Sequence, residues 1–340
     1  MQDRMQSGSK LLDLAYGAVF GTLFPLFLFA ARKYARVERA YAIADQVINA
    51  FAELRPKYLD AVRTNLAQVT GLPADHPRVR DLAMQVMRQN AYAWVDFFYY
   101  GQRDPRLALE RCATIEGLAA LEEAHQAGRG AILLTAHAGS FELGGLLLRS
   151  ADMRLYAVYK PDRFAAVERL RTRMRARGGV EGIPVGGQGF STLPLLKVLR
   201  EGKVVGMQGD RDFNLTGLPL PFFGRTAYFP RGPWELAAMT GAPIFCTFFY
   251  GDETRRFHVR FSDPIHVDGD RARRREAIES GMRRYVAILE DLVRRHPDQW
   301  YCFYPFWDDP LRSALPPGGR EIPSSAAASP SVTPTQPATS

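Results

Sequence analysis

Cysteine is scarce in this chain, and its spacing argues against two classes of protein. The 340 residues include only three cysteines, which are Cys112, Cys246 and Cys302. They lie far apart and form neither a CxxC pair nor a Cys/His spacing typical of a zinc module. This pattern argues against a disulfide framework and a structural zinc site, and we expect a reducing compartment.

Other patterns are missing as well. The sequence contains no internal repeat, no recognised nucleic-acid-binding motif and no G-x-S-x-G nucleophile motif. We therefore expect neither a nucleic-acid partner nor a serine nucleophile. No small-x-small cleavage site closely follows the apolar N-terminal run, which argues against a cleaved signal peptide.

Acidic residues are the minority among the charged ones. Lys and Arg number 44 against 36 Asp and Glu, which gives a net charge of +8. Such a balance suits an anionic partner, namely an anionic membrane surface, an acidic carrier protein or a nucleic acid. Arginine supplies most of the excess and binds phosphate bidentately, which favours phosphate-bearing partners.

One long apolar run lies near the N-terminus. Residues 11–31 carry a single charge, and the basic residues Arg32 and Lys33 follow directly. A helix of roughly 20 apolar residues can span a bilayer, and the positive flank would leave the bulk of the chain in the cytosol. Pro25 weakens a regular spanning helix, so a helix lying in the interface or a buried core helix are the alternatives. We predict a membrane anchor over residues 1–32.

The rest of the chain predicts one α/β domain over residues 33–311, with a disordered tail rich in Ser, Pro, Ala and Thr over 312–340. Residues 33–127 have apolar residues at helical spacing, as in 37–54 and 79–100. From 128 to 311, short apolar runs alternate with amphipathic stretches, which predicts a three-layer α/β sandwich. The expected strands are 131–137, 154–160, 182–186, 203–210, 242–251 and 257–267, and the expected helices are 141–150, 164–178, 191–202, 232–241 and 275–296.

A histidine and a carboxylate follow the first of these strands. In the stretch TAHAGSFELGG, His137 ends the strand and Glu142 lies in the first turn of the next helix. Ligand chemistry gathers at the carboxyl ends of strands in α/β sheets. A tight turn at Gly139 would fold the carboxylate onto the imidazole, which fixes its tautomer and makes it a general base. The alternative is structural: Glu142 favours the helix start, and His137 is a satisfied strand-end residue.

Two further charged groups accompany this pair. Asp210 and Arg211 follow the strand 203–210, so we expect them beside His137 on the same sheet edge. Asp210 and Asp212 together invite a metal-site interpretation, but no further ligand spacing supports one, and we expect neither a metal nor a cofactor. The arginines of 171–177 alternate along a helix, so only some of them can face a cleft.

These motifs, in this order, resemble the late acyltransferases of lipid A biosynthesis, within the wider group of glycerolipid acyltransferases. His137-Ala-Gly-Ser-Phe-Glu142 is similar to the H-x4-D/E motif of that group. The blocks RTRMRARGGVEGIPV, VVGMQGDRDF, GLPLPFFGRTAYFPRGPWELAAMTGAPI and HPDQWYCFYPFWDD follow in the family's order, and the resemblance covers residues 10 to 310. The departures are Ser140 for Asn, Phe141 for Trp, and the aromatic stretch after Trp300. They indicate a divergent branch.

The resemblance implies an enzyme that transfers a fatty acyl chain from acyl-carrier protein or acyl-CoA to a hydroxyl of a lipid A precursor or related glycolipid. It would act as a monomer at the cytoplasmic face of a bacterial inner membrane. Other specialised lipids such as aryl polyenes, water as acceptor, and a non-catalytic basic membrane-binding protein are the alternatives. His137 and Glu142 would be catalytic, and Arg175 would bind acceptor phosphate or stabilise transition-state charge. Further substrate-binding residues would be Asp210, Arg211, Phe222, Phe223, Gly224 and Arg225.

The last four of these residues belong to the block PLPFFGRTAYFPRGP, which we expect to form an irregular loop because it is rich in Pro and Gly. Its aromatic side chains would line a dry groove for the acyl chain, and Arg225 would meet a phosphate. Core packing is the alternative for at least one of Phe222 and Phe223.

Overall fold

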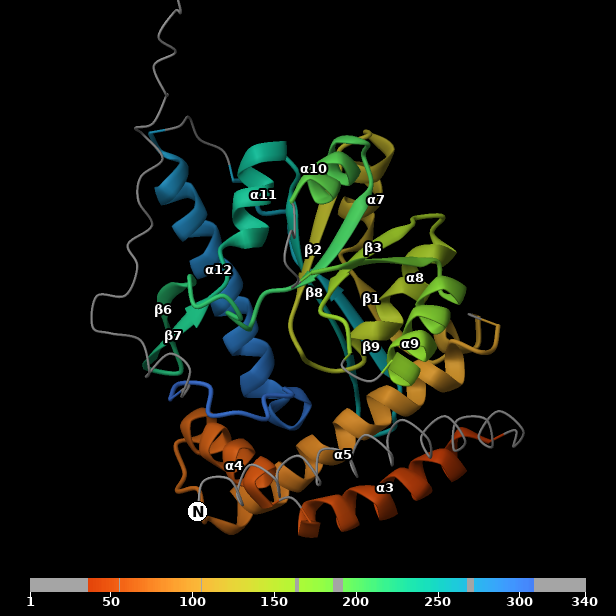
Figure 1. The fold of residues 1–340 in the computed structure, drawn as a ribbon, viewed down its shortest axis with the longest axis vertical. Coiled ribbons are helices and arrows are strands. Elements are labelled where there is room, and N and C mark those ends of the chain that lie inside the picture. Colours follow the sequence, from red (N-terminus) through yellow and green to blue (C-terminus); the bar gives the residue numbers. More distant parts are fainter. Residues whose placement is uncertain are drawn as a thin grey trace, which may run out of the picture.

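A computed structural model describes most of the chain between residues 36 and 308 (Figure 1). The described ranges are 36–54, 56–104, 106–162, 165–185, 192–267 and 272–308. The predicted anchor at 11–31 and the predicted disordered tail at 312–340 lie outside them. Within these ranges, every helix is too short or too polar to cross a bilayer.

The centre of the fold is a seven-stranded sheet with the order β1-β9-β8-β2-β5-β3-β4. Neighbouring strands run parallel except β8 and β9, which are antiparallel. All six strands expected from the sequence are present. The strands are β1 (Cys112–Glu116), β2 (Ala131–Thr135), β3 (Leu155–Tyr159), β4 (Val180–Pro184), β5 (Val204–Gln208), β8 (Ile244–Gly251) and β9 (Phe257–Phe261).

Helices cover both faces of this sheet, which confirms the predicted three-layer arrangement. Successive side chains of a strand point to opposite faces. In β2, Ala131 and Leu133 join one hydrophobic cluster, while Ile132 and Leu134 join the other. Burying each leucine-sized side chain contributes roughly 1.5–3 kcal/mol. The first face packs against α7 (Leu118–Gln126), α8 (Gly144–Ser150) and α9 (Ala165–Arg177), and the second against α10 (Leu193–Arg200), α11 (Gly232–Thr240) and α12 (Arg274–Arg295).

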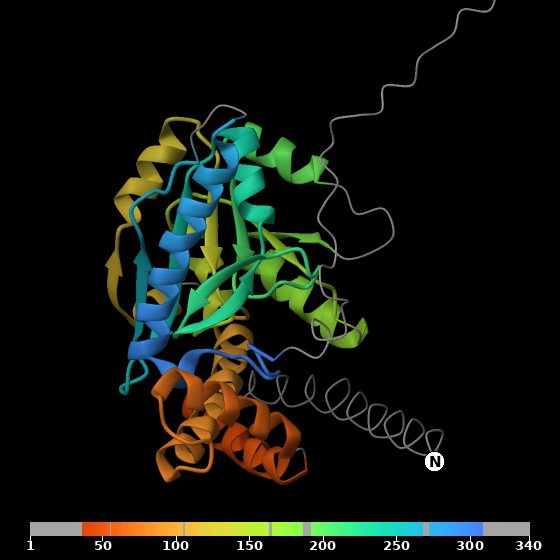
Figure 2. The same cartoon turned by 90° about the vertical axis from the view of Figure 1, so that its left-hand side faces the viewer.

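A separate helical segment lies at one end of the sheet in both views (Figures 1 and 2). It consists of α3 (Val37–Leu54), α4 (Pro56–Thr70) and α5 (Pro77–Tyr100), as the helical periodicity predicted. The longest of them, α5, contacts two short 3₁₀ turns, η2 (Phe141–Leu143) and η3 (Pro297–Gln299). Because η2 contains Glu142, this helical segment closes the sheet edge at which the candidate site forms. The short helix α6 (Arg106–Leu109) fits the expectation that 33–127 is mostly helical, whereas the strand β1 in that region was not expected.

The expected irregular loop around Phe222 is instead a two-stranded hairpin of β6 (Leu218–Phe222) and β7 (Arg225–Phe229). Its turn residues, Phe223 and Gly224, both have positive φ, at 49° and 75°. That geometry matches the right-handed twist of the two strands. Each strand of a two-stranded sheet has one free edge. The prolines of β6 are tolerated there because, among the described residues, no third strand needs their missing N–H groups.

Candidate active site

His137 and Asp210 meet at the carboxyl edge of the central sheet, as the sequence predicted. Strands β2 and β5 are paired so that Thr135 lies opposite Gln208, and His137 and Asp210 each follow two positions later. The Asp210 carboxylate contacts the imidazole at 2.8 Å between Oδ1 and Nδ1. Its second oxygen, Oδ2, accepts a hydrogen bond from the backbone N–H of His137 at 3.1 Å. The register of two neighbouring parallel strands therefore creates this pair.

The turn after His137 depends on a glycine. Gly139 has φ of 58°, and a Cβ at this position would lie 2.1 Å from the carbonyl oxygen of Phe249. The next backbone N–H, that of Ser140, donates to the same carbonyl at 2.7 Å. The chain must therefore approach β8 closely, which only glycine allows.

Glu142 does not contact the imidazole, and this corrects the predicted pairing of His137 with Glu142. Its carboxylate instead accepts hydrogen bonds from two arginines of α9. Arg175 Nε lies 3.0 Å from Oε2, and Arg171 Nη2 lies 3.2 Å from Oε1. Asp210 takes the position on Nδ1 that the sequence assigned to Glu142.

The arginines of α9 lie on two different faces of the helix, as their spacing predicted. Arg171 and Arg175 are four residues apart and share the face that holds Glu142, while Arg173 and Arg177 are exposed. The Arg175 guanidinium also lies over the ring of Tyr159, 4.5 Å from its centroid. Arg175 is thus committed to Glu142 through two hydrogen bonds and is almost fully buried.

The environment sets the protonation of these groups. Burial lowers the pKa of His137, and Asp210 offsets this only in part, so the imidazole is neutral at pH 7. Burial also acts to raise the pKa of Asp210, but contacts with His137 and Arg211 prevail and bring it to about 2. Burial opposes ionisation of Glu142 too, yet Arg175 and Arg171 hold its pKa below the usual value. The site therefore combines a neutral imidazole with two carboxylates.

Arg211 lies beside His137 and contributes to lowering the pKa of that imidazole. One of its terminal nitrogens, Nη2, donates to the backbone carbonyl of Tyr301, and its guanidinium lies 5.6 Å from the ring centroid of Tyr304. Its Nε is buried and has no hydrogen-bond partner among the described residues. Arg211 is thus a cation at the site with donor capacity left over.

The hairpin residues do not form a wall beside His137. Phe222 is fully buried, at 0% exposure, and packs against Trp300, Phe306 and Trp307. Phe223 is also buried, and Arg225 forms a surface ion pair with Asp308 at 2.7 Å. Core packing, the alternative left open by the sequence, therefore describes both phenylalanines. Gly224 completes the hairpin turn, where a Cβ would meet open space.

One buried carboxylate behind the motif escaped sequence reasoning. Asp96 of α5 is buried, accepts a hydrogen bond from the Tyr41 hydroxyl, and has the Ser140 hydroxyl among its neighbours. Burial raises its pKa to about 7, although Tyr41, Arg111 and Arg255 all favour the ionised form. Its position inside an aromatic helical stretch gave no signal, because its four partners come from four separate segments of the chain.

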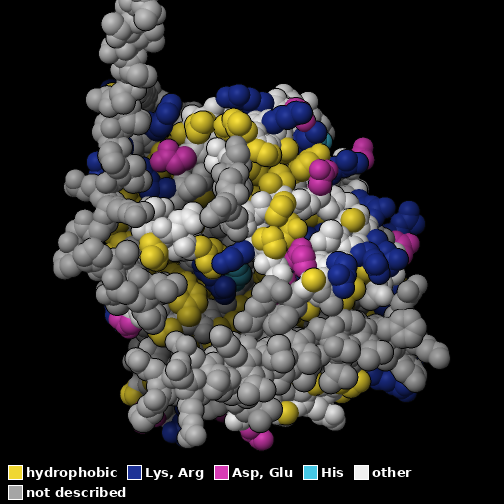
Figure 3. Space-filling view, viewed as in Figure 1, with side chains coloured by type: hydrophobic (Ala, Val, Ile, Leu, Met, Phe, Trp, Pro, Cys, Tyr) yellow, Lys and Arg dark blue, Asp and Glu magenta, His cyan; other side chains and the backbone are white. Residues whose placement is uncertain are grey.

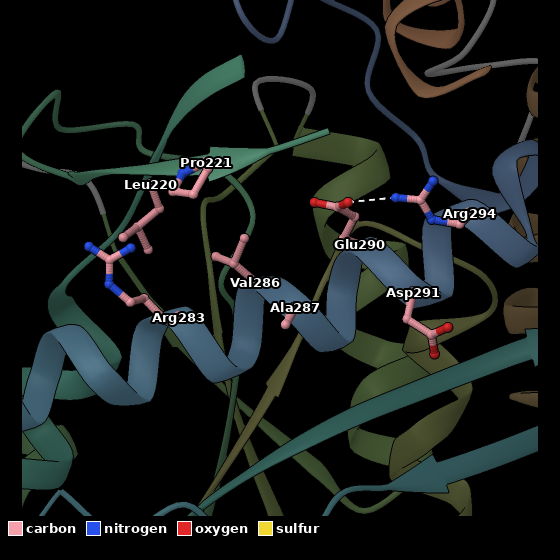
Figure 4. Close-up of a pocket in the computed structure, with 8 residues that line it drawn as sticks. All are labelled: Leu220, Pro221, Arg283, Val286, Ala287, Glu290, Asp291 and Arg294. Carbon is pink, nitrogen blue, oxygen red and sulfur yellow. Dashed lines mark hydrogen bonds and ion pairs between the residues drawn. The ribbon is translucent and has the colours of Figure 1, made fainter. Parts of the chain in front are cut away.

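The space-filling view shows a histidine side chain at the surface in the middle of one face, next to Lys or Arg side chains (Figure 3). A pocket of about 420 Å³ lies beside Arg175, Tyr159 and Gly182. A second pocket, of about 370 Å³, lies between α12 and β6, with Arg294 paired to Glu290 at its rim (Figure 4). None of the residues around His137 lines that second pocket. Among the described residues, no group of three or more His, Cys, Asp or Glu could hold a metal ion.

The Glu142 cluster allows a stability prediction. Replacing Glu142 by Ala leaves Arg175 buried without its counter-charge, so we expect the free energy of unfolding to fall by about 3–5 kcal/mol. Urea denaturation followed by circular dichroism measures this. The matched control is Glu279→Ala, which removes the exposed partner of Arg283 on α12 and should cost about 1 kcal/mol or less. Equal losses in the two variants would contradict a buried ion pair at Glu142.

The sequence is similar to one family profile and to several known proteins. Residues 9–308 match the sequence profile of the bacterial lipid A biosynthesis acyltransferases. The chain is 27% identical to a phosphatidylinositol mannoside acyltransferase of Mycobacterium tuberculosis over 256 residues, covering 73% of this chain and 77% of the relative. It is 26% identical to the Mycolicibacterium smegmatis protein of that name over 324 residues, or 90% and 95% of the two chains. A lipid A biosynthesis acyltransferase of Haemophilus influenzae is 23% identical over 194 residues, or 56% and 58% of the two chains. The chain therefore belongs to the bacterial lipid A biosynthesis acyltransferase family, and it is an acyltransferase.

Proposed function

We propose that this enzyme transfers a fatty acyl group from a thioester donor, acyl-carrier protein or acyl-CoA, to a hydroxyl of a membrane glycolipid. His137 acts as the general base and Asp210 as the carboxylate that orients it. The observation that carries this proposal is the 2.8 Å contact between Asp210 Oδ1 and His137 Nδ1 at the carboxyl edge of the sheet. Because Asp210 is ionised, this contact favours a ring proton on Nδ1, which supports Nε2 as the basic nitrogen.

The reaction needs no nucleophile from the protein. Nε2 of His137 takes the proton of the acceptor hydroxyl while the acceptor oxygen attacks the thioester carbonyl. The tetrahedral intermediate then collapses, the carbon–sulfur bond breaks, and the imidazolium returns its proton to the leaving thiolate. An ester and a free thiol are the products. Asp210, ionised throughout, stabilises the imidazolium that forms between the two proton transfers.

Two cationic groups have separate tasks in this scheme. Arg211 lies next to the imidazole and retains an unpartnered buried Nε among the described residues, which suits it to stabilise the developing oxyanion. Arg175 is neutralised by Glu142, so we assign this pair to holding the motif turn against α9. Glu142 then contributes to catalysis by positioning and by its negative charge near His137.

The acceptor we propose is a glycolipid of the phosphatidylinositol mannoside kind. Support comes from the two mycobacterial relatives, which carry that substrate in their names and match most of this chain. Ser140 and Phe141, which depart from the usual lipid A motif, agree with an acceptor other than a lipid A precursor. Action at the cytoplasmic face of an anionic bacterial inner membrane is supported by the apolar run at 11–31 and the net charge of +8.

The test is a transfer assay on the purified full chain in lipid vesicles. Acyl-carrier protein and CoA thioesters are offered with either a phosphatidylinositol mannoside or a lipid A precursor, and products are identified by mass spectrometry. We expect an acylated mannoside product. Acylation of the lipid A precursor alone would overturn the proposed acceptor, and release of free fatty acid without any acceptor product would replace transfer by hydrolysis.

A further inference from the structure

The block around Trp300 lies against the motif turn, to which it is joined by an isolated β-bridge. Trp300 forms an antiparallel bridge with Ala138. The backbone N–H of Tyr301 donates to the His137 carbonyl at 2.7 Å, and that of Gly139 donates to the Gln299 carbonyl at 2.9 Å. The backbone on both sides of the catalytic candidate is therefore fixed by a segment more than 150 residues away in the sequence.

Gln299 attaches this block to the end of β8. Its side-chain oxygen accepts from the backbone N–H of Gly251 at 2.9 Å, and its amide nitrogen donates to the Gly251 carbonyl at 2.7 Å. These two bonds imitate one step of strand pairing, and Gln299 is buried. These bonds fix the position of the block along the end of β8. They therefore also fix the direction in which the next side chain, Trp300, points.

The indole of Trp300 reaches the carboxylate that orients His137. Its Nε1–H donates to Asp210 Oδ2 at 3.3 Å, and the ring is 3% exposed. Asp210 Oδ2 thus accepts two hydrogen bonds, one from this indole and one from the His137 backbone at 3.1 Å. The other oxygen, Oδ1, is left to face Nδ1 of the imidazole. The two donors on Oδ2 restrict rotation of the carboxylate about its Cβ–Cγ bond.

We propose that Trp300 is a positioning residue of the acyl-transfer reaction: its indole N–H holds the Asp210 carboxylate in the rotation that presents Oδ1 to His137. This inference rests on the proposed role of His137 as the base. Without the indole donor, Asp210 can turn away from the imidazole, and His137 then spends less time in the reactive tautomer and orientation. The hydrogen bond from the Trp300 indole to Asp210 is long, at 3.3 Å, and Oδ2 keeps a second donor in the His137 backbone N–H. Loss of the indole donor therefore weakens catalysis without abolishing it.

The test replaces Trp300 by Phe, which keeps an aromatic ring against Phe222 and Phe306 but removes the donor. Trp307→Phe is the matched control. Trp307 also packs on Phe222, and its indole N–H donates to the Phe222 carbonyl at 3.2 Å instead of to Asp210. Both variants lose one indole and one hydrogen bond in the same aromatic cluster, so both should lower the melting temperature by similar amounts.

We expect Trp300→Phe to lower kcat about tenfold while KM stays within twofold, because the substrate surfaces are unchanged and only the base is misaligned. Trp307→Phe should keep kcat within twofold. Equal kcat in the two variants, or a loss confined to KM, overturns the positioning role. If His137→Ala retains activity, the proposed base is wrong instead, so the two failures are distinguishable.

A second measurement does not depend on the folding of Trp300→Phe. The chain has four tryptophans, which give four indole N–H signals in a ¹⁵N-Trp-labelled sample. Replacing Asp210 by Asn removes the charge that accepts from Trp300 only, since Trp307 donates to a backbone carbonyl. We expect one indole signal to move far more than the other three. Four unmoved signals would overturn the Trp300–Asp210 contact.

Discussion

Replacing His137 by Ala is expected to lower kcat/KM for acyl transfer by at least about 10³-fold while leaving the fold intact. The imidazole is the group placed to take the acceptor proton, and removal of a general base costs about 10²–10⁴-fold. Its side chain is 19% exposed, so its loss opens no large cavity. Initial rates at pH 7.5, followed as thiol release together with product formation, measure the effect.

His266→Ala is the matched control for that variant. His266 is exposed and follows β9, well after the motif in the sequence. Its removal should therefore change neither the rate nor the melting temperature. Transfer by His137→Ala at more than about a tenth of the wild-type rate would sink the base assignment.

Asp210→Asn has an expected effect of similar size, because it reverses the tautomer of His137. Oδ2 of Asp210 accepts two N–H donors, from the His137 backbone and from Trp300. An asparagine must place its carbonyl oxygen there, since an NH₂ group would face two donors. Its NH₂ group then faces Nδ1, which must accept, and the ring proton moves to Nε2. A ring protonated at Nε2 cannot take the acceptor proton, so kcat should fall about 10³–10⁴-fold, the scale of the same change in a Ser-His-Asp triad.

The chain provides a second His/Asp pair as the control for this substitution. Asp252, which directly follows β8, contacts Nε2 of His258 in β9 at 3.1 Å, and no residue of the His137 site takes part. Asp252→Asn should therefore leave kcat unchanged. A similar fall in kcat for both variants would indicate general destabilisation, and full activity of Asp210→Asn would remove Asp210 from the mechanism.

The sheet, and the edge of it that carries the candidate site, were predictable because the spacing of apolar residues in strands and helices is a local property of the sequence. The strand β2 ends two residues before His137, and β5 ends two residues before Asp210. Parallel strands of an α/β sheet present their carboxyl ends on one edge, so the meeting of His137 and Asp210 followed from the pattern.

The partner of the imidazole could not be assigned by sequence distance. Glu142 is five residues from His137, but η2 directs its side chain toward α9, where Arg175 and Arg171 bind it. Asp210 is 73 residues away yet adjacent in the sheet. Strand register therefore placed Asp210, which the sequence assigned to substrate binding, where Glu142 was expected.

The sequence predicted a loop where the hairpin forms, and it assigned no role to Trp300. The two failures have related causes. Prolines in 218–222 indicated a loop, although an isolated two-stranded hairpin tolerates them at its edges. Trp300 stood out only through its family block, because its contact with Asp210 joins residues 90 positions apart. Such contacts depend on how loops return to the sheet, which periodicity does not encode.

The most direct test of the central claim is the pH dependence of kcat/KM for acyl transfer by the wild-type enzyme. Burial lowers the pKa of His137, so the base is neutral through the cytosolic pH range and becomes protonated only in acid. We predict a constant rate above about pH 6.5 and a tenfold fall per pH unit below a single ionisation that lies under that value. An acid limb centred above pH 7 would contradict a neutral, buried His137 acting as the base.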